Sequence, residues 1–251
     1  TYATLWRLAP GSASAAPLSA LSAQLLFVEA QSGLAQTVPL TSADDALFRA
    51  QLERIAEFLD LRHRARERLR RLLAVLGSEE EFLSPFGIRS LSRHHERHPF
   101  LFEAEGRTHR VDYVPGESNT HLFGGNSNWR GPVWMPINFL LIESLQKFGH
   151  YYGDSFMVEF PTRSGQWMTL WDASLQLEQR LVNLFRRNGA GQRPFNGDVE
   201  LFQSDPHWRD LIQFNEYFHG DNGRGVGASH QTGWSAMVCK MINQLSRYPT
   251  T

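Results

Sequence analysis

Apolar residues recur at helical spacing through the first part of the chain. From Asp44 to Leu59 they form one face of a predicted amphipathic helix. A second helix is predicted over Arg64–Leu76 and ends at Gly77. The basic run Arg62–Arg71 is interpreted as its solvent-facing side. The apolar stripe of this helix is predicted from Leu61, Leu69, Leu72 and Leu73.

Helical patterns return in the second half of the chain. Four helices are predicted there, over Val133–Tyr151, Asp172–Arg187, Pro206–Tyr217 and Thr232–Leu245. The first is strongly apolar and is predicted to be buried. The second stops at Asn188-Gly189. The third starts after Asp205, a good N-cap, with proline at the first helical position.

The remaining segments are predicted to be short or irregular. Weak periodicity predicts a short helix around Leu18–Glu29, and alternation predicts a short strand over His109–Tyr113. Leu83–Ser92 is predicted to be a turn-rich loop. The loop Val114–Gly131 is long, aromatic and rich in glycine, which indicates a functional loop. Helices separated by long decorated loops favour an all-α single domain over residues 1–251, an α/α toroid or part of one, with its site on the loop side.

Composition narrows the partners of the chain. Its 251 residues carry a formal net charge of -1. This charge argues against a basic surface that binds nucleic acid or an anionic membrane. The single cysteine, Cys239, excludes an internal disulfide and is interpreted as a small core residue. No membrane span or signal peptide is expected, so cytoplasm is the expected compartment. Since the chain does not begin with Met, it is interpreted as a processed product or a fragment.

The most informative stretch is FNEYFHGDNGRGVGASHQTGW, from Phe214 to Trp234. It places one acidic residue, Glu216, beside Tyr217 and Phe218, which can exclude water from one side of a carboxylate suited to proton transfer. The alternative is an ordinary surface glutamate. Groups that bind sugar hydroxyls crowd the loop after it: His219, Asp221, Asn222, Arg224, Ser229, His230 and Gln231.

A second stretch, FGGNSNWRGPVWMPINF from Phe123 to Phe139, has the same character. Trp129, Trp134 and Trp234 can stack on the apolar faces of pyranose rings, or they can pack in a core. Glycines beside them indicate close approach of the backbone to another group. Together the two stretches predict a carbohydrate cleft.

Two other chemistries fit the sequence poorly. His219, Asp221 and His230 do not have the spacing of a compact zinc signature, so no metal is predicted. Gly220–Gly227 has the glycine spacing of a phosphate loop, but no strand precedes it and no Lys-Ser/Thr pair follows. Nucleotide binding is therefore discounted.

Three motifs together resemble glycoside hydrolase family 63. WRGPVWMPINFLLIESL (Trp129–Leu145) is similar to the family's WRGPxWxxxN segment, and EYFHGDNGRGVGASHQTGW is similar to its closing motif. LSPFGIRSLS resembles a loop of bacterial members. The resemblance covers about Glu80 to Ile242, and the family includes processing α-glucosidases, bacterial α-glucosidases and mannosylglycerate hydrolases.

The resemblance implies an (α/α)6 barrel and inverting hydrolysis of α-glucosyl or α-mannosyl linkages by two carboxylates. Aligned from Thr232-Gly233-Trp234, the general base falls on Glu216. No cofactor is implied, and the partner is an oligosaccharide or small glycoside. The implied substrate-binding residues are Trp129, Arg130, Gly131, Trp134, Asn138, His219, His230, Gln231 and Trp234.

One feature of the family has no counterpart here. The family's general acid is an aspartate in a tryptophan-rich segment, and Asp44, Asp45, Asp60 and Asp112 lack that context. The chain is therefore predicted to be the C-terminal portion of a larger catalytic domain, supplying the general-base half of the site and nearly inactive alone. The alternatives are a non-catalytic carbohydrate-binding or scaffold module of the same fold, and an α/α enzyme of another class such as a phosphorylase or lyase.

Overall fold

The computed structural model describes residues 25–28, 35–38, 50, 53–54, 63–121 and 127–248. The chain divides into two compact units, residues 1–67 and 68–251. In the first unit, β1 (Leu25–Val28) pairs antiparallel with β2 (Ala35–Val38). The helix predicted around Leu18–Glu29 is therefore wrong over β1, where the apolar run LLFV contains an aromatic and a β-branched residue, Phe27 and Val28, which favour a strand. Most of the predicted Asp44–Leu59 helix lies outside the described residues.

The helix predicted to end at Gly77 is confirmed. Residues 63–76 are helical, and the Gly77 amide donates to Leu73 O at 2.8 Å. Within the second unit, Leu69, Leu73 and Leu76 pack against the core. Leu72, which was predicted to belong to the stripe, is 69% exposed.

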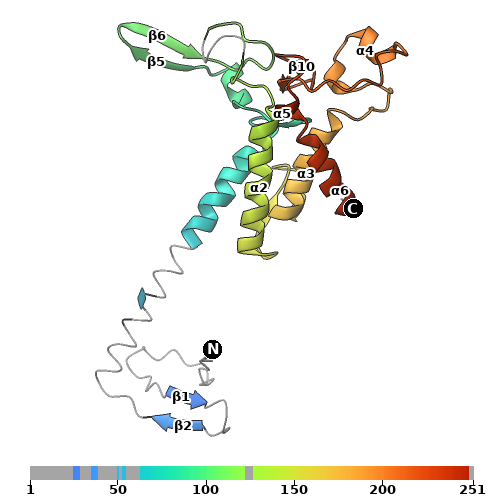
Figure 1. Ribbon diagram of the computed structural model, residues 1–251. Helices are drawn as coiled ribbons and strands as arrows, with labels where there is room; N and C mark the ends of the chain where they lie inside the picture. The colour runs from blue at the N-terminus through green and yellow to red at the C-terminus, as the bar shows by residue number, and fades with distance from the viewer. Residues whose placement is uncertain are drawn as a thin grey trace. The chain divides into compact units, whose positions relative to one another are not determined.

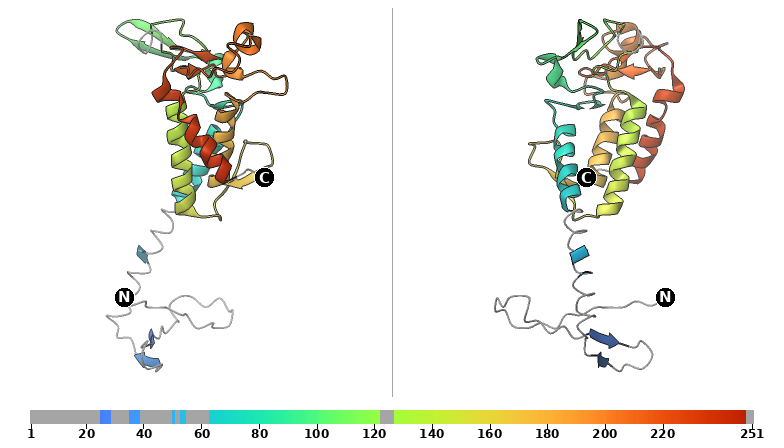
Figure 2. Two further views of the ribbon diagram at one scale, coloured as in Figure 1. Left: turned by 45° about the vertical axis from the view of Figure 1, so that its right-hand side comes forward. Right: turned by 90° about the vertical axis from the view of Figure 1, so that its left-hand side faces the viewer.

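Three helices carry the core of the second unit (Figures 1 and 2). They are α2 (Met135–Tyr152), α3 (Leu170–Asn183) and α6 (Val238–Arg247). Helix α3 packs against both α2 and α6. Thr169 caps α3 by accepting from the Asp172 amide at 3.1 Å. The buried hydrophobic residues of these helices include Ile142, Leu177, Leu181 and Met241.

Helix α3 ends earlier than its sequence predicts. Its last residue is Asn183, and Leu184 and Phe185 continue in tight turns that bury both side chains. The last predicted helix is broken into α5 (Thr232–Ser235) and α6. In α6 Val238 and Met241 face the core, so Cys239 points away and is exposed. The prediction that Cys239 is a core residue is wrong.

The helix predicted over Pro206–Tyr217 is also wrong. The helical residues lie before it, in α4 (Glu200–Ser204), and Asp205 caps only a turn by accepting from the His207 amide at 2.8 Å. Tyr217–Phe218 forms β9, which pairs with β10 (Gly225–Val226). Phe218 also exchanges backbone hydrogen bonds of 2.8 and 3.0 Å with Val133. This long-range pairing overrides the local helical pattern.

Short antiparallel hairpins complete the second unit. Each is a two-stranded sheet: β3 (Leu83–Ser84) with β4 (Gly87–Ile88), β5 (Phe100–Ala104) with β6 (Arg107–Val111), and β7 (Met157–Glu159) with β8 (Trp167–Thr169). Strand β6 begins two residues before the predicted strand and ends at Val111. Two short 3-10 helices, η2 (Arg93–Glu96) and η3 (Pro194–Asn196), lie in the connections. Figure 1 shows β5–β6, β10, α4 and α5 gathered at one end of α2 and α3.

The lengths of the helices show whether any of them could span a membrane. Among the described residues, no helix is both long and apolar enough to cross a bilayer. The closed (α/α)6 arrangement implied by the resemblance stays a prediction.

Candidate functional site

Glu216 lies immediately before β9, at the loop end of the second unit. Its amide donates to Ala228 O at 2.9 Å, which aligns it with the segment after β10. Its carboxylate accepts two hydrogen bonds, from Ser127 Oγ to Oε1 at 2.7 Å and from the Ala228 amide to Oε2 at 3.1 Å. The side chain is half-buried. The carboxylate is therefore held by groups from two loops while part of its surface stays open to water.

An aromatic cluster lies beside this carboxylate: Trp129, Trp134, Tyr217 and Trp234. Trp134 stacks on Trp129 with ring centroids 3.9 Å apart and on Tyr217 at 4.7 Å, and it meets Trp234 edge-on at 5.6 Å. Trp134 is 1% exposed and donates to Asn128 O, so it supports the cluster from within. Trp129 is half-buried and Trp234 is 38% exposed. These two rings offer the faces on which a sugar can stack.

Arg130 is buried beneath the site. It donates to Asp112 Oδ1 at 3.2 Å and to Asn119 Oδ1 at 2.6 Å, and thus ties the loop that follows β6 to the WRGP segment. In this structure Arg130 fixes the loop rather than facing solvent.

Asn138 and Gly131 also belong to the scaffold. Asn138 is fully buried in α2, and its amide accepts from Ile88 N at 2.7 Å and donates to Ile88 O at 3.0 Å. Gly131 has φ of 144°, and a Cβ there would lie 2.6 Å from the Tyr113 ring. Close contact with Tyr113 thus requires glycine at this position.

A polar network that the sequence analysis missed anchors the Gly-rich loop. Arg89 donates to Asp221 Oδ1 at 3.0 Å and to the Tyr113 hydroxyl at 3.1 Å, and that hydroxyl donates to Asp221 at 2.9 Å. Arg89 is buried, and burial is the main cause that raises the pKa of Tyr113. The Tyr113 phenol therefore stays protonated and acts as a donor. Arg89 and Asp221 lie in two of the quoted motifs, but the sequence does not show that they pair across 132 positions.

Two other predicted residues of the Gly-rich loop, His219 and His230, have different surroundings. The His219 ring is half-buried, and its Nδ1 accepts from the amides of Asp221 at 3.2 Å and Asn222 at 3.4 Å. Burial lowers the pKa of His219, which favours this neutral acceptor form. His230 is exposed beside Phe214, and the Gln231 amide donates to Phe214 O at 2.6 Å. His219 thus orders the loop, whereas His230 remains available at the surface.

Ser127 and Glu117 are two further site residues that the sequence analysis did not single out. Ser127 contacts Glu216, and Glu117 accepts from the Tyr217 hydroxyl and the Gly227 amide, each at 3.3 Å. Both lie in the Val114–Gly131 loop, whose length was the available signal. No group of three His, Cys, Asp or Glu side chains in the described part of the chain is arranged to hold a metal ion.

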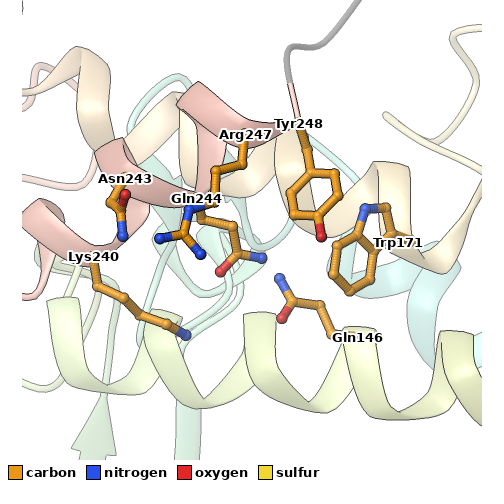
Figure 3. Close-up of a pocket in the computed structure, with 7 residues that line it drawn as sticks. All are labelled: Gln146, Trp171, Lys240, Asn243, Gln244, Arg247 and Tyr248. Carbon is orange, nitrogen blue, oxygen red and sulfur yellow. The ribbon is translucent and has the colours of Figure 1, made fainter.

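A cavity of about 260 Å³ lies elsewhere, among α2, α3 and α6 (Figure 3). Figure 3 shows side chains from the three helices around it, with Lys240 and Arg247 as its cations. None of the predicted site residues lines it. Its lining consists of Gln146, Trp171, Lys240, Asn243, Gln244, Arg247 and Tyr248.

Comparisons with known proteins show the family of the chain. The family model of the mannosylglycerate hydrolase MGH1-like glycoside hydrolase domain matches residues 19–235. The uncharacterized protein YMR196W of Saccharomyces cerevisiae is 50% identical over 182 residues, which are 72% of this chain and 17% of that protein.

Two glucosidases are more distant relatives. The mannosyl-oligosaccharide glucosidase of Saccharomyces cerevisiae is 23% identical over 72% of this chain. The probable mannosyl-oligosaccharide glucosidase of Schizosaccharomyces pombe is 24% identical over 70% of it. The matched segment spans only 15% of each glucosidase and 17% of YMR196W. The resemblance to the family of processing glucosidases is confirmed, and the chain belongs to the mannosylglycerate hydrolase MGH1-like glycoside hydrolase family.

Proposed function

We propose that this chain forms the general-base half of a glycoside hydrolase active site that acts on α-glucosyl or α-mannosyl linkages. The observation that carries the proposal is the placement of Glu216. Its carboxylate is fixed by Ser127 and the Ala228 amide and lies in the segment that packs Tyr217 against the tryptophans. Family membership and the two glucosidase relatives support a glycosidase.

The proposed reaction is a single displacement with inversion. Glu216 accepts a proton from a water molecule while the water oxygen bonds to the anomeric carbon. The bond from that carbon to the leaving oxygen breaks, and a general acid protonates the oxygen. Each Glu216 oxygen already accepts one hydrogen bond, so the carboxylate is oriented but keeps lone pairs for the water proton.

The general acid is proposed to be an aspartate outside this chain, in a complete (α/α)6 domain. Inverting pairs stand roughly 6.5–9.5 Å apart, which leaves room for the water. The open faces of Trp129 and Trp234 would bind the sugar ring, and His230 would contact its hydroxyls. The chain alone is expected to bind sugar and to hydrolyse it slowly.

Product stereochemistry tests this proposal. The natural full-length protein is mixed with aryl α-glucosides and α-mannosides, and proton NMR records the first anomer released. Inversion gives the β-anomer before mutarotation. First release of the α-anomer would contradict the mechanism. Cleavage that requires phosphate and releases a sugar phosphate would indicate a phosphorylase. Sugar binding without any hydrolysis by the full-length protein would favour the binding-module alternative.

A further inference from the structure

Glu117 is a second carboxylate within the structure around Glu216. It lies in the first part of the Val114–Gly131 loop and is exposed. Its Oε1 accepts from the Gly227 amide and its Oε2 from the Tyr217 hydroxyl, both at 3.3 Å. One carboxylate therefore connects β9 to the turn that follows β10.

The same turn holds Glu216. The amide after Gly227, that of Ala228, donates to Glu216 Oε2 at 3.1 Å. Consecutive backbone amides thus serve the two carboxylates. Gly227 has φ of 67°, and a Cβ at this residue would lie 2.7 Å from Glu216 Oε2. A small rotation of this turn would consequently change the position of the Ala228 donor relative to Glu216.

The backbone just before Glu117 is held by hydrogen bonds. Asn128 Nδ2 donates to Val114 O at 2.7 Å and to Gly116 O at 2.8 Å. Asn128 is buried, so these bonds are shielded from water. Glu117 is therefore attached to the segment that also presents Ser127 to Glu216. The same segment thus helps to position both carboxylates.

We infer that Glu117 is a positioning residue for the general base: by holding the Gly227 amide and the Tyr217 hydroxyl, it fixes the turn whose next amide orients Glu216. The inference rests on the proposed function and adds a residue to it. Burial, followed by the charge of Glu117, raises the pKa of Tyr217, so the phenol remains a donor to Glu117.

Steady-state kinetics of the natural full-length protein test this role. Glu117→Gln keeps the shape but places an NH₂ group against one of the two donors. We expect kcat to fall about 10- to 100-fold with KM within about 3-fold, because a displaced base affects the transition state more than sugar binding. Tyr217→Phe keeps the stacking on Trp134, removes one Glu117 partner and should give a smaller fall in kcat. Glu200→Gln, in α4, is the matched control and should leave both constants unchanged.

Several results would overturn the inference. A raised KM with normal kcat for Glu117→Gln would make Glu117 a substrate contact, and unchanged kcat would remove its role. In a Glu216→Gln background, Glu117→Gln should have no further effect, since it acts through Glu216. Full activity of Glu216→Gln would instead reject the proposed function.

A readout independent of turnover separates the two claims further. In the natural full-length protein labelled with ¹⁵N-alanine, Glu117→Gln should shift the amide resonance of Ala228, whereas Glu200→Gln should not. An unmoved Ala228 resonance in folded Glu117→Gln overturns the inference whether or not hydrolysis is observed. If Glu117→Gln does not fold, Tyr217→Phe carries the same test.

Discussion

At the residue scale, several side chains of the WRGP segment maintain the backbone that presents the site. Arg130 binds Asp112 and Asn119, and Trp134 is covered by its aromatic neighbours. The sequence indicated a sugar site from their residue types, which suit hydroxyl binding and stacking equally well. Burial separates the two roles, and burial depends on long-range packing that the local sequence does not show.

Gly131 provides a residue-scale test of this scaffold. Gly131→Ala places a Cβ 2.6 Å from the Tyr113 ring, which is too close for two carbon atoms. The φ of 144° at this position is also unfavourable for alanine. We expect a loss of about 2 kcal/mol or more in the free energy of unfolding, measured by urea denaturation. Gly189→Ala, where the added Cβ meets open space, should change it by less than about 0.5 kcal/mol. Equal stability of the two variants would contradict the tight Tyr113 contact.

At the element scale, long periodic segments were predicted well and the site loops were not. The apolar period and turn residues indicated α2, α3 and the helix ending at Gly77, with boundary errors of a few residues. The error at Pro206–Tyr217 has a specific cause. Asp205-Pro206 starts only a turn, and Phe218 pairs with Val133, a partner 85 residues earlier by number. Such pairing leaves no signal in local periodicity.

The attachment of the β3–β4 hairpin to α2 depends on Asn138. Asn138→Ala would leave the buried Ile88 N–H and C=O without these partners. We expect the free energy of unfolding to fall by about 3 kcal/mol, because each unsatisfied group carries its own desolvation cost. Asn183→Ala, at an exposed helix end, is the control, and chemical denaturation compares the two. A loss below about 1 kcal/mol for Asn138→Ala would show that the hairpin is held mainly by other contacts.

At the scale of the whole second unit, a buried carboxyl group links stability to pH. Glu178 in α3 is 1% exposed, and burial raises its pKa from 4.5 to about 7, opposed by the charge of Lys240 and reinforced by Glu143. Between these pKa values the folded chain holds a proton that the unfolded chain has released. The free energy of unfolding therefore decreases as the pH rises through this window.

Glu178→Gln removes this titration and keeps an acceptor for Gln146. The difference in the free energy of unfolding, variant minus native chain, should increase as the pH rises. From about pH 5 to about pH 8 this increase should be on the order of 2 kcal/mol. Thermal and urea denaturation across this range measure the difference. Asp154→Asn, which removes an exposed carboxylate, reports the general effect of losing one charge. A Glu178→Gln difference that does not change with pH would contradict the raised pKa.

At the scale of the whole molecule, the sequence was most informative about the family. Three motifs along the chain indicated the family, which the family model confirms. In the structure they come into contact, since Arg89 donates to Asp221 and Trp134 stacks on Tyr217. The Arg89–Tyr113–Asp221 network and Glu117 were missed. Each includes a hydrogen bond between residues about a hundred positions apart, and local sequence patterns do not show such pairings.

Removal of the Glu216 carboxylate function tests the central claim most directly. In the natural full-length protein, Glu216→Gln keeps the shape and hydrogen-bonding reach of the side chain but cannot accept the proton from water. Turnover at saturating glycoside should fall by at least about 100-fold, while the sugar dissociation constant from calorimetry stays within a few-fold. Glu200→Gln should match the native protein in both measurements. Native turnover by Glu216→Gln would contradict the general-base role and, with it, the proposed function of this site.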